Sequence, residues 1–160
     1  AFHEVGGLDA DFFAHMEEID LCWRVQKRGY KVMVNPASVV YHLGGGTLSE
    51  GSDFKYELNF RNNLIMLVKN LDGWWVPTLL WRMVLDGVSV LKFIADGKPK
   101  LLKVVLKAHF AFWSSLSRTL KKRSEIRAKS TQRVQLYANS VVWQYFAKKK
   151  KTFKDLPGIQ

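Results

Sequence analysis

The stretch from Gly6 to Arg24 constrains this chain more than any other, because it crowds five carboxylates between a Gly-Gly pair and an amphipathic helix. These acids are Asp9, Asp11, Glu17, Glu18 and Asp20. A run of acids is most often a solvated helix face, and this interpretation has to be weighed against a functional one. The residues around the acids decide between the two.

The periodicity after the acids predicts a helix from about Met16 to Arg28, followed by a left-handed stop at Gly29. Its apolar positions follow helical spacing: Ile19, Leu21, Cys22 and Val25. Cys22 is the single cysteine, so an internal disulfide is excluded, and its place on the apolar side indicates a small buried side chain in a reducing compartment.

The first turn of this helix holds acids that face different directions. Asp20 and Arg24 are four residues apart and can pair, which gives Asp20 a structural role. Glu18 lies about 100° from Glu17 and about 200° from Asp20 around the helix axis. One acid can therefore face a cleft while another locks the helix.

The next part of the chain reads as two short strands and a second helix. Tyr30 to Val34 alternates and is rich in valine, an Asn-Pro turn follows, and Ser38 to His42 has the same character. The second strand ends at His42, beside the three glycines 44–46. An amphipathic helix is then predicted from Phe54 to Leu71, with Ser52 or Asp53 as its cap.

The basic charge is confined to the C-terminal part of the chain. Residues 98–160 carry 16 Lys and Arg against 2 Asp and Glu, a net charge of +14, whereas residues 1–97 carry 9 against 12, a net charge of −3. Hydrophobic residues make up 48% of the whole chain and aromatic residues 13%, enough for one modest core and against disorder throughout.

Two apolar segments follow the Trp74-Trp75 pair. Residues 78–95 are interrupted by three charges, each costing about 2.5 to 3.5 kcal/mol at the centre of a spanning helix, so we do not expect them to cross a membrane. After a Gly-Lys-Pro break, residues 101–120 combine apolar and basic side chains. The apolar set is Leu102, Val105, Leu106, Phe110, Trp113 and Leu116, and the basic set is Lys98, Lys100, Lys103, Lys107, Arg118, Lys121, Lys122 and Arg123. This pattern is typical of a helix at a membrane interface, with lysines on anionic lipid.

Two other interpretations of the basic segment stand beside the membrane. A helical pair packed on the preceding domain, with a solvated basic face, would show the same composition. A nucleic acid is the other partner that the charge suggests. No nucleic-acid-binding motif accompanies the aromatic residues, which cluster with aliphatic ones at helical spacing, and we therefore expect no nucleic-acid partner.

Together these motifs resemble the C-terminal half of the catalytic domain of inverting family 2 glycosyltransferases, especially bacterial rhamnosyltransferase-like members. The string is G-G-L-D, F-F, E-E-I-D-L-C-W-R, R-G-Y-K-V, the N-P turn and V-V-Y-H-L-G-G-G-T, followed by F-R-N-N-L-I-M-L-V-K-N. The resemblance implies an α/β fold. Residues 1–72 would be the C-terminal part of a GT-A nucleotide-sugar-binding domain without its N-terminal nucleotide-binding half, 73–130 a mostly α-helical, membrane-associating extension, and 131–160 a basic tail.

By this resemblance Glu18 occupies the position of the catalytic base. Inversion needs a general base within hydrogen-bond reach of the acceptor hydroxyl as it attacks the anomeric carbon. The family commonly has Asp where this chain has Glu18, so Asp20 as the base, or no catalytic carboxylate here at all, are the alternatives. The resemblance also implies acceptor-binding roles for Gly6, Gly7, Glu17 and Asp20, although a Gly-Gly pair can equally be an ordinary turn.

The same resemblance makes His42 a candidate ligand for a divalent metal, Mn²⁺ or Mg²⁺, on the nucleotide diphosphate. The D-x-D partner motif is absent from the expected strand ends, and Asp9-Ala10-Asp11 stands downstream of its place, so we interpret it as a coincidence. A hydrogen bond from His42 to acceptor or phosphate is the alternative. Arg61 would bind a phosphate group of donor or acceptor, unless it is an ordinary surface arginine.

The sequence therefore predicts part of an inverting glycosyltransferase of cell-envelope glycan synthesis. Its donor would be a nucleotide sugar, its acceptor a glycan or lipid-linked glycan, and its place the cytoplasmic face of the membrane, bound peripherally to anionic lipid. The 160 residues alone would turn over nothing measurable without the missing half. The alternative is a non-catalytic, basic, amphipathic membrane-binding module.

Overall fold

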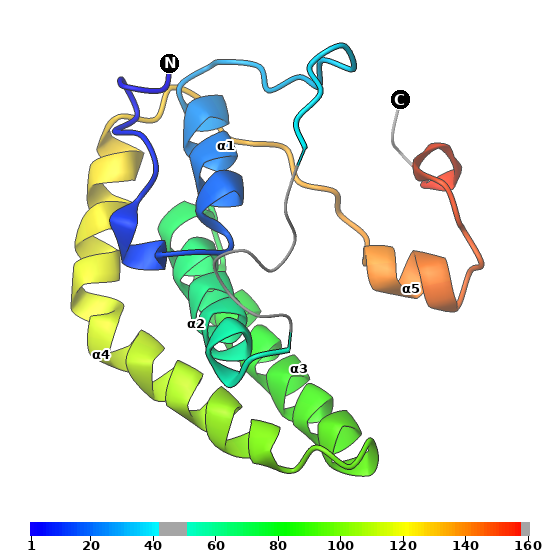
Figure 1. The fold of residues 1–160 in the computed structure, drawn as a ribbon. Coiled ribbons are helices and arrows are strands. Elements are labelled where there is room, and N and C mark those ends of the chain that lie inside the picture. The colour runs from blue at the N-terminus through cyan, green and yellow to red at the C-terminus, as the bar shows by residue number, and fades with distance from the viewer. Residues whose placement is uncertain (42–50, 158–160) are drawn as a thin grey trace.

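The computed structural model describes residues 1–41 and 51–157. In chain order, the elements are η1 (Ala10–Phe12), α1 (Glu17–Lys27), α2 (Asp53–Asn70), α3 (Trp75–Ala95), α4 (Lys100–Ala128), α5 (Val141–Phe146) and η2 (Phe153–Asp155). Figure 1 shows α4 as a long curved helix that runs beside α2 and returns from α3, while α5 stands apart from this helical body.

The predicted α/β fold is wrong for the residues that the structure describes, because none of them forms a strand. Residues 30–34 and 38–41, expected in two strands, run without a partner, and Val34 and Tyr41 are 90% and 96% exposed. Their β propensity can be realised only when a neighbouring strand accepts their backbone hydrogen bonds, and the described residues offer none. His42, the end of the second predicted strand, lies outside the described residues.

The turn between these two segments does form as the sequence predicts. Asn35 accepts hydrogen bonds on its side chain from the Ala37 amide (3.1 Å) and on its carbonyl from the Ser38 amide (3.0 Å). An asparagine before proline commonly closes a turn in this way. The local turn signal was therefore sufficient here, whereas the strand signal depended on a partner.

Helix α1 matches its predicted range to within a residue at each end. Gly29 has a φ of +87°, the left-handed conformation expected of the stop residue. The chain that leaves α4 crosses this end of the helix, where the Thr131 amide donates to the Lys27 carbonyl at 2.8 Å. The carbonyl that the helix end would leave unsatisfied therefore has a partner.

Helix α2 forms the centre of the core. Ser52 caps it by accepting a hydrogen bond from the Lys55 amide (3.3 Å), as predicted. One cluster of buried residues joins α2 to η1, α1, α3 and α4: Phe12, Trp23, Leu64, Ile65, Met66, Val68, Leu79 and Phe112. A second cluster, Phe60, Val90, Val105 and Ala108, continues the core toward the α3–α4 turn. The basic C-terminal helix thus shares one core with the acidic N-terminal segment.

Helices α3 and α4 are separated at the predicted Gly-Lys-Pro break, where Gly97 has a φ of +75°. Between them Asp86 is buried, forms an ion pair with Arg82 (2.5 Å) and is hydrogen-bonded to the His109 ring (3.0 Å). Among the residues that the structure describes, no helix combines the length and the apolar character that crossing a membrane requires.

Candidate functional site

The acidic segment, residues 9–20, lies against α2 and α4, and its last acid is enclosed in ion pairs. Asp20 is 0% exposed and accepts hydrogen bonds from Arg24 Nε (2.8 Å) and Asn70 Nδ2 (2.7 Å). Lys69 Nζ lies 2.9 Å from Asp20 Oδ1, the oxygen that also accepts from Asn70. The predicted pairing of Asp20 with Arg24 is confirmed. A buried carboxylate with three partners fixes the register of α1 on α2.

Arg24 extends this network to the glycine turn. Its Nη1 donates to the Val5 carbonyl (2.6 Å) and its Nη2 to the Gly7 carbonyl (2.7 Å). Gly6 and Gly7 have φ values of +84° and +65°, the left-handed region where a side chain is strained. The glycines therefore let the carbonyls turn toward the guanidinium. Their predicted role in acceptor binding stays a prediction.

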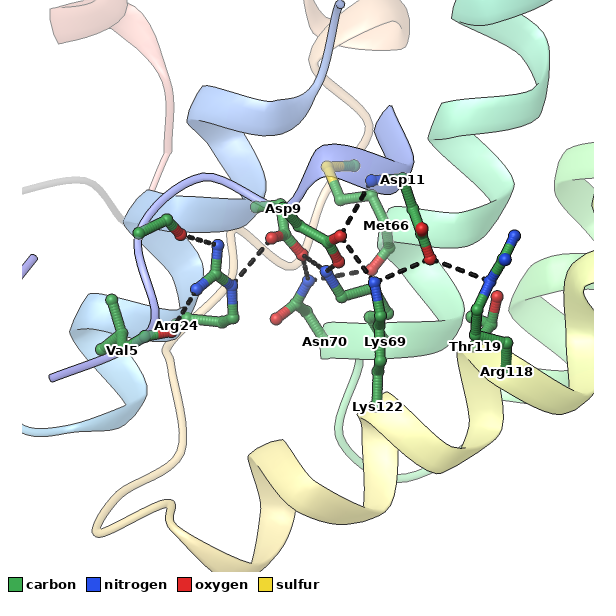
Figure 2. A network of polar contacts seen from close by, with 12 residues as sticks. Val5, Asp9, Asp11, Arg24, Met66, Lys69, Asn70, Arg118, Thr119 and Lys122 are labelled. Atoms are coloured by element: carbon green, nitrogen blue, oxygen red, sulfur yellow. Dashed lines mark hydrogen bonds and ion pairs between the residues drawn. The ribbon is translucent and has the colours of Figure 1, made fainter. Parts of the chain in front are cut away.

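Asp9 and Asp11 are held by lysines from two helices, as Figure 2 shows. Lys122 on α4 lies 2.6 Å from Asp9 Oδ1 and 2.7 Å from Asp11 Oδ2, and Lys69 on α2 lies 2.5 Å from Asp9 Oδ2. Arg118 Nε adds a contact of 3.0 Å to Asp11. The Asp-Ala-Asp sequence, which we interpreted as a coincidence, thus ties the acidic segment to α4.

The pKa values in this network follow from its pairing. Burial by itself would raise the pKa of Asp9, but the hydrogen bonds from Lys122 and Lys69 outweigh it and hold the pKa well below its ordinary value. Burial likewise works to lower the pKa of Lys122, and the bonds to Asp11 and Asp9 raise it instead. Each partner therefore stabilises the charged form of the other.

A strained turn leads from these aspartates into α1. Phe13, His15 and Met16 have φ values of 63°, 67° and 73°, a region that non-glycine residues rarely adopt. The buried Asn62 on α2 holds this turn, since its Nδ2 lies 2.9 Å, 2.7 Å and 2.9 Å from the carbonyls of Phe12, Ala14 and His15. The turn therefore presents the start of α1 in one fixed orientation.

Arg61 lies next to Asn62 and holds the same turn. Its Nη2 donates to the carbonyls of Asp11 (2.9 Å) and Phe12 (3.2 Å), and its Nε donates to Asn62 Oδ1 (2.9 Å). Burial lowers the pKa of this guanidinium, and the nearby Arg118 adds to that effect. Arg61 also lines a cleft of about 560 Å³ between α2 and α4, so a ligand could reach its side chain from solvent. Its role as a phosphate ligand stays a prediction.

Glu17 and Glu18 follow the strained turn and differ in their surroundings. Glu18 is exposed, and its carboxylate has no hydrogen bond or ion pair to the residues that the structure describes. Glu17 is partly buried, and one of its oxygens is enclosed without a hydrogen-bond partner in the same described part. Because Asp9, Asp11 and Asp20 are neutralised by cations, Glu17 and Glu18 are the acids of this segment without an ion pair to the described residues, and Glu18 is the more exposed of the two.

The described residues do not fit a divalent metal. Residues 1–41 and 51–157 contain no group of three His, Cys, Asp or Glu side chains able to hold one. The nearest candidates, Asp9 and Asp11, already share Lys122. His42, the predicted ligand, lies outside these ranges. The metal therefore stays a prediction.

Sequence reasoning missed several residues of this site and misplaced others. Asn62, Lys69 and Asn70 interrupt the apolar positions of α2, and polar residues within a core-facing stretch were the available signal. On α4, Val105 was expected to face lipid but is buried in the core. Arg123 was expected on the basic face, but it is buried and donates to the Val68 carbonyl at 2.6 Å.

Comparison with known proteins supports one relationship. Over 83 residues, 52% of this chain, it is 29% identical to an N-acetylglucosaminyl-diphospho-decaprenol L-rhamnosyltransferase of Mycobacterium tuberculosis, with the same values for strains CDC 1551 and H37Rv. The matched region spans 27% of the length of those proteins. No family model matches the chain, and no solved structure shows a significant match. The predicted resemblance to glycosyltransferases is thus supported in general terms over half of the chain.

Proposed function

We propose that this chain is part of an inverting glycosyltransferase that transfers a sugar from a nucleotide-sugar donor to a lipid-linked or polysaccharide acceptor in cell-envelope glycan synthesis. The observation that carries the proposal is the similarity to the mycobacterial rhamnosyltransferases. The name of those proteins describes transfer of L-rhamnose to a diphospho-linked lipid, and that chemistry supports a lipid-linked acceptor.

In the proposed reaction Glu18 is the general base. Its carboxylate takes the proton of an acceptor hydroxyl while that oxygen forms a bond to the anomeric carbon of the donor. The bond between this carbon and the diphosphate oxygen breaks on the opposite face, and the nucleoside diphosphate leaves with the bonding electrons. The strained turn at residues 13–16 and the buried pairs of Asp20 hold Glu18 in place.

We also propose that the protein binds peripherally to the cytoplasmic face of a membrane. Two apolar stripes support this. The α3 outer face consists of exposed residues at helical spacing, Val76, Leu80, Val84, Val88, Leu91 and Ile94, and the α4 outer face consists of Leu102, Leu106, Phe110 and Trp113. Lysines near the α3–α4 turn, among them Lys98, Lys100 and Lys103, could meet anionic headgroups.

A divalent metal held by His42 completes the proposal taken from the resemblance. When bound, Mn²⁺ or Mg²⁺ would neutralise charge on the leaving diphosphate. A His42→Ala variant should then need more metal for nucleotide-diphosphate binding, which a metal titration of that binding measures.

Transfer by the complete protein containing this chain tests the proposal. Glu18→Gln keeps the shape of the side chain but removes its basicity, so transfer should fall by about 10² to 10⁴-fold with little change in donor binding. Asp96→Asn, an exposed carboxylate near the α3–α4 turn, is the control and should retain activity. Activity of Glu18→Gln within a few-fold of the unmodified protein would remove Glu18 from the role of base.

The exposed α3 and α4 outer faces also favour a second function, a non-catalytic membrane-binding module. Vesicle binding and release of nucleoside diphosphate, measured on the same protein, separate the two functions. A protein that binds anionic vesicles but releases no nucleoside diphosphate from any nucleotide sugar, with or without acceptor, would be such a module.

A further inference from the structure

The cleft of about 560 Å³ between α2 and α4 has a cationic lining. Three basic side chains, Arg61, Arg118 and Lys121, face it together with one acid, Asp11. That acid is already paired with Lys122 (2.7 Å) and with Arg118 Nε (3.0 Å). The lining therefore keeps an excess of positive charge, and its volume lies in the range of pockets that bind small ligands.

The basic groups of this cleft have donors to spare. Arg61 uses Nε and Nη2 on the backbone turn and on Asn62, and its Nη1 has no partner among the described residues. Arg118 engages Asp11 through Nε alone in the same part of the chain, and Lys121 has no ion pair there. Guanidinium groups with free donors suit bidentate contacts to phosphate oxygens. Burial lowers the pKa of Arg61, the nearby Glu57 and Asp11 work against it, and Arg118 adds a smaller lowering.

Small side chains on α4 keep the cleft open. Ala111, Ser114, Ser115 and Ser117 line it. Ser114 and Ser115 donate to the carbonyls of Ala111 (2.9 Å) and Phe112 (2.8 Å), whereas Ser117 has no hydrogen bond to the described residues and keeps its donor for a ligand. The cleft thus combines three cations, one free hydroxyl and little bulk.

Two residues of the cleft lining, Ser114 and Ser117, share a side of α4 with residues of the α4 outer face. Ser117 follows Trp113, and Ser114 follows Phe110 and Leu106, at intervals of four residues on one side of the helix. Phe110 is 76% exposed. From Leu106 to Ser117 the helix rises about 16 Å, so a charged site and an apolar stripe lie within the length of one lipid molecule. The arrangement matches a ligand with a charged head next to an apolar phase.

We propose that this cleft binds a diphosphate group, with Arg61, Arg118, Lys121 and Ser117 as its ligands. The proposal deepens the proposed function, because a lipid-linked diphosphate acceptor would place its head in the cleft and its lipid beside Phe110 and Trp113. A free nucleoside diphosphate carries the same chemistry. The cleft itself is assigned from its own geometry and does not depend on which of the two sources supplies the group.

Binding by the complete protein to three probes tests the cleft: inorganic diphosphate, farnesyl diphosphate in phosphatidylcholine vesicles, and farnesol in the same vesicles. The variant Arg118→Gln with Lys121→Gln removes two exposed charges. Arg127→Gln with Lys129→Gln removes two exposed charges from the end of α4, outside this cleft. We expect the first variant to bind farnesyl diphosphate at least about tenfold more weakly than the second, since each lost contact to a charged group is worth about that factor. Both double variants should bind farnesol equally.

The probes also identify the source of the diphosphate. Binding of farnesyl diphosphate well above inorganic diphosphate supports a lipid-linked ligand, and equal binding supports a soluble one. The cleft proposal is overturned if the unmodified protein binds neither diphosphate probe, or if the two double variants bind them alike. A protein that passes this test but shows no sugar transfer would contradict the proposed function alone, and one that transfers sugar but fails this test would contradict the cleft alone.

Discussion

Asp20→Asn is the substitution that most directly tests how the acidic segment is held. Asp20 is buried and accepts from Arg24 at 2.8 Å and from Asn70 at 2.7 Å, with Lys69 at 2.9 Å. Asparagine has one oxygen in place of two, so its amide nitrogen would face a donor whose hydrogen bond the carboxylate now accepts. Lys69 would keep its ion pair with Asp9 (2.5 Å), but the buried Arg24 would lose its carboxylate partner.

The expected loss of stability is large. Removing one partner of a buried ion pair costs about 3 to 5 kcal/mol. For a chain of this size each kcal/mol shifts the unfolding midpoint by about 2 to 4 °C, so Asp20→Asn should unfold roughly 6 to 20 °C earlier. Thermal unfolding followed by circular dichroism, with urea titration for the free energy of unfolding, measures both quantities.

Asp96→Asn is the matched control, because it breaks an exposed ion pair with the same four-residue spacing as the buried pair of Asp20 and Arg24. Lys92 and Asp96 are also four residues apart on a helix, but their side chains are 73% and 48% exposed. Such a pair is worth about 0.3 to 0.5 kcal/mol. If Asp20→Asn costs no more than this control, the buried network does not hold α1 on α2. If it keeps its stability and loses sugar transfer, Asp20 acts on the acceptor instead.

Two further predictions concern acid stability and the membrane. The pKa of Asp9 is held below its ordinary value of 3.8, so the stability that its ionised carboxylate contributes is complete above that pH and is lost as the pH falls toward the folded-state pKa. The difference in unfolding free energy between the unmodified chain and Asp9→Asn should therefore narrow between about pH 5 and pH 2. A difference that stays constant over this range would contradict the pairing. Replacing Leu80 and Val84 by Gln should reduce the fraction of protein that sediments with anionic vesicles. Raised salt should reduce that fraction for the unmodified protein. If the unmodified protein does not sediment with anionic vesicles at low salt, the proposed membrane surface is excluded.

Local signals in the sequence were sufficient for α1, for the start of α2 and for the break between α3 and α4. The apolar spacing and Gly29 defined α1, Ser52 defined the start of α2, and the break before α4 was read from Gly97 and the proline that follows. Each of these signals acts within one or two turns of helix, where the chain supplies its own hydrogen-bond partners. Element boundaries of this kind need no knowledge of tertiary contacts.

The strands and the polar contacts depended on partners far away in the sequence. The valine-rich segments at 30–34 and 38–41 have β propensity, but propensity forms no ladder without a neighbour, and the described residues supply none. The same limit applied to Lys122, which we expected to lie on anionic lipid. Its partner Asp9 lies 113 residues earlier, and no local pattern indicates that contact.

The two sides of α4 explain why the basic segment could be read only in part. Its inner side places Val105, Ala108 and Phe112 in the core and directs Lys122 to the acidic segment, so part of its positive charge balances carboxylates within the chain. Its outer side keeps Phe110 exposed and carries Arg118 and Lys121 at the cleft. A net charge of +14 over residues 98–160 therefore overstates what an external partner would meet. Of the charges left for a ligand, Arg118 and Lys121 lie at the cleft together with Arg61.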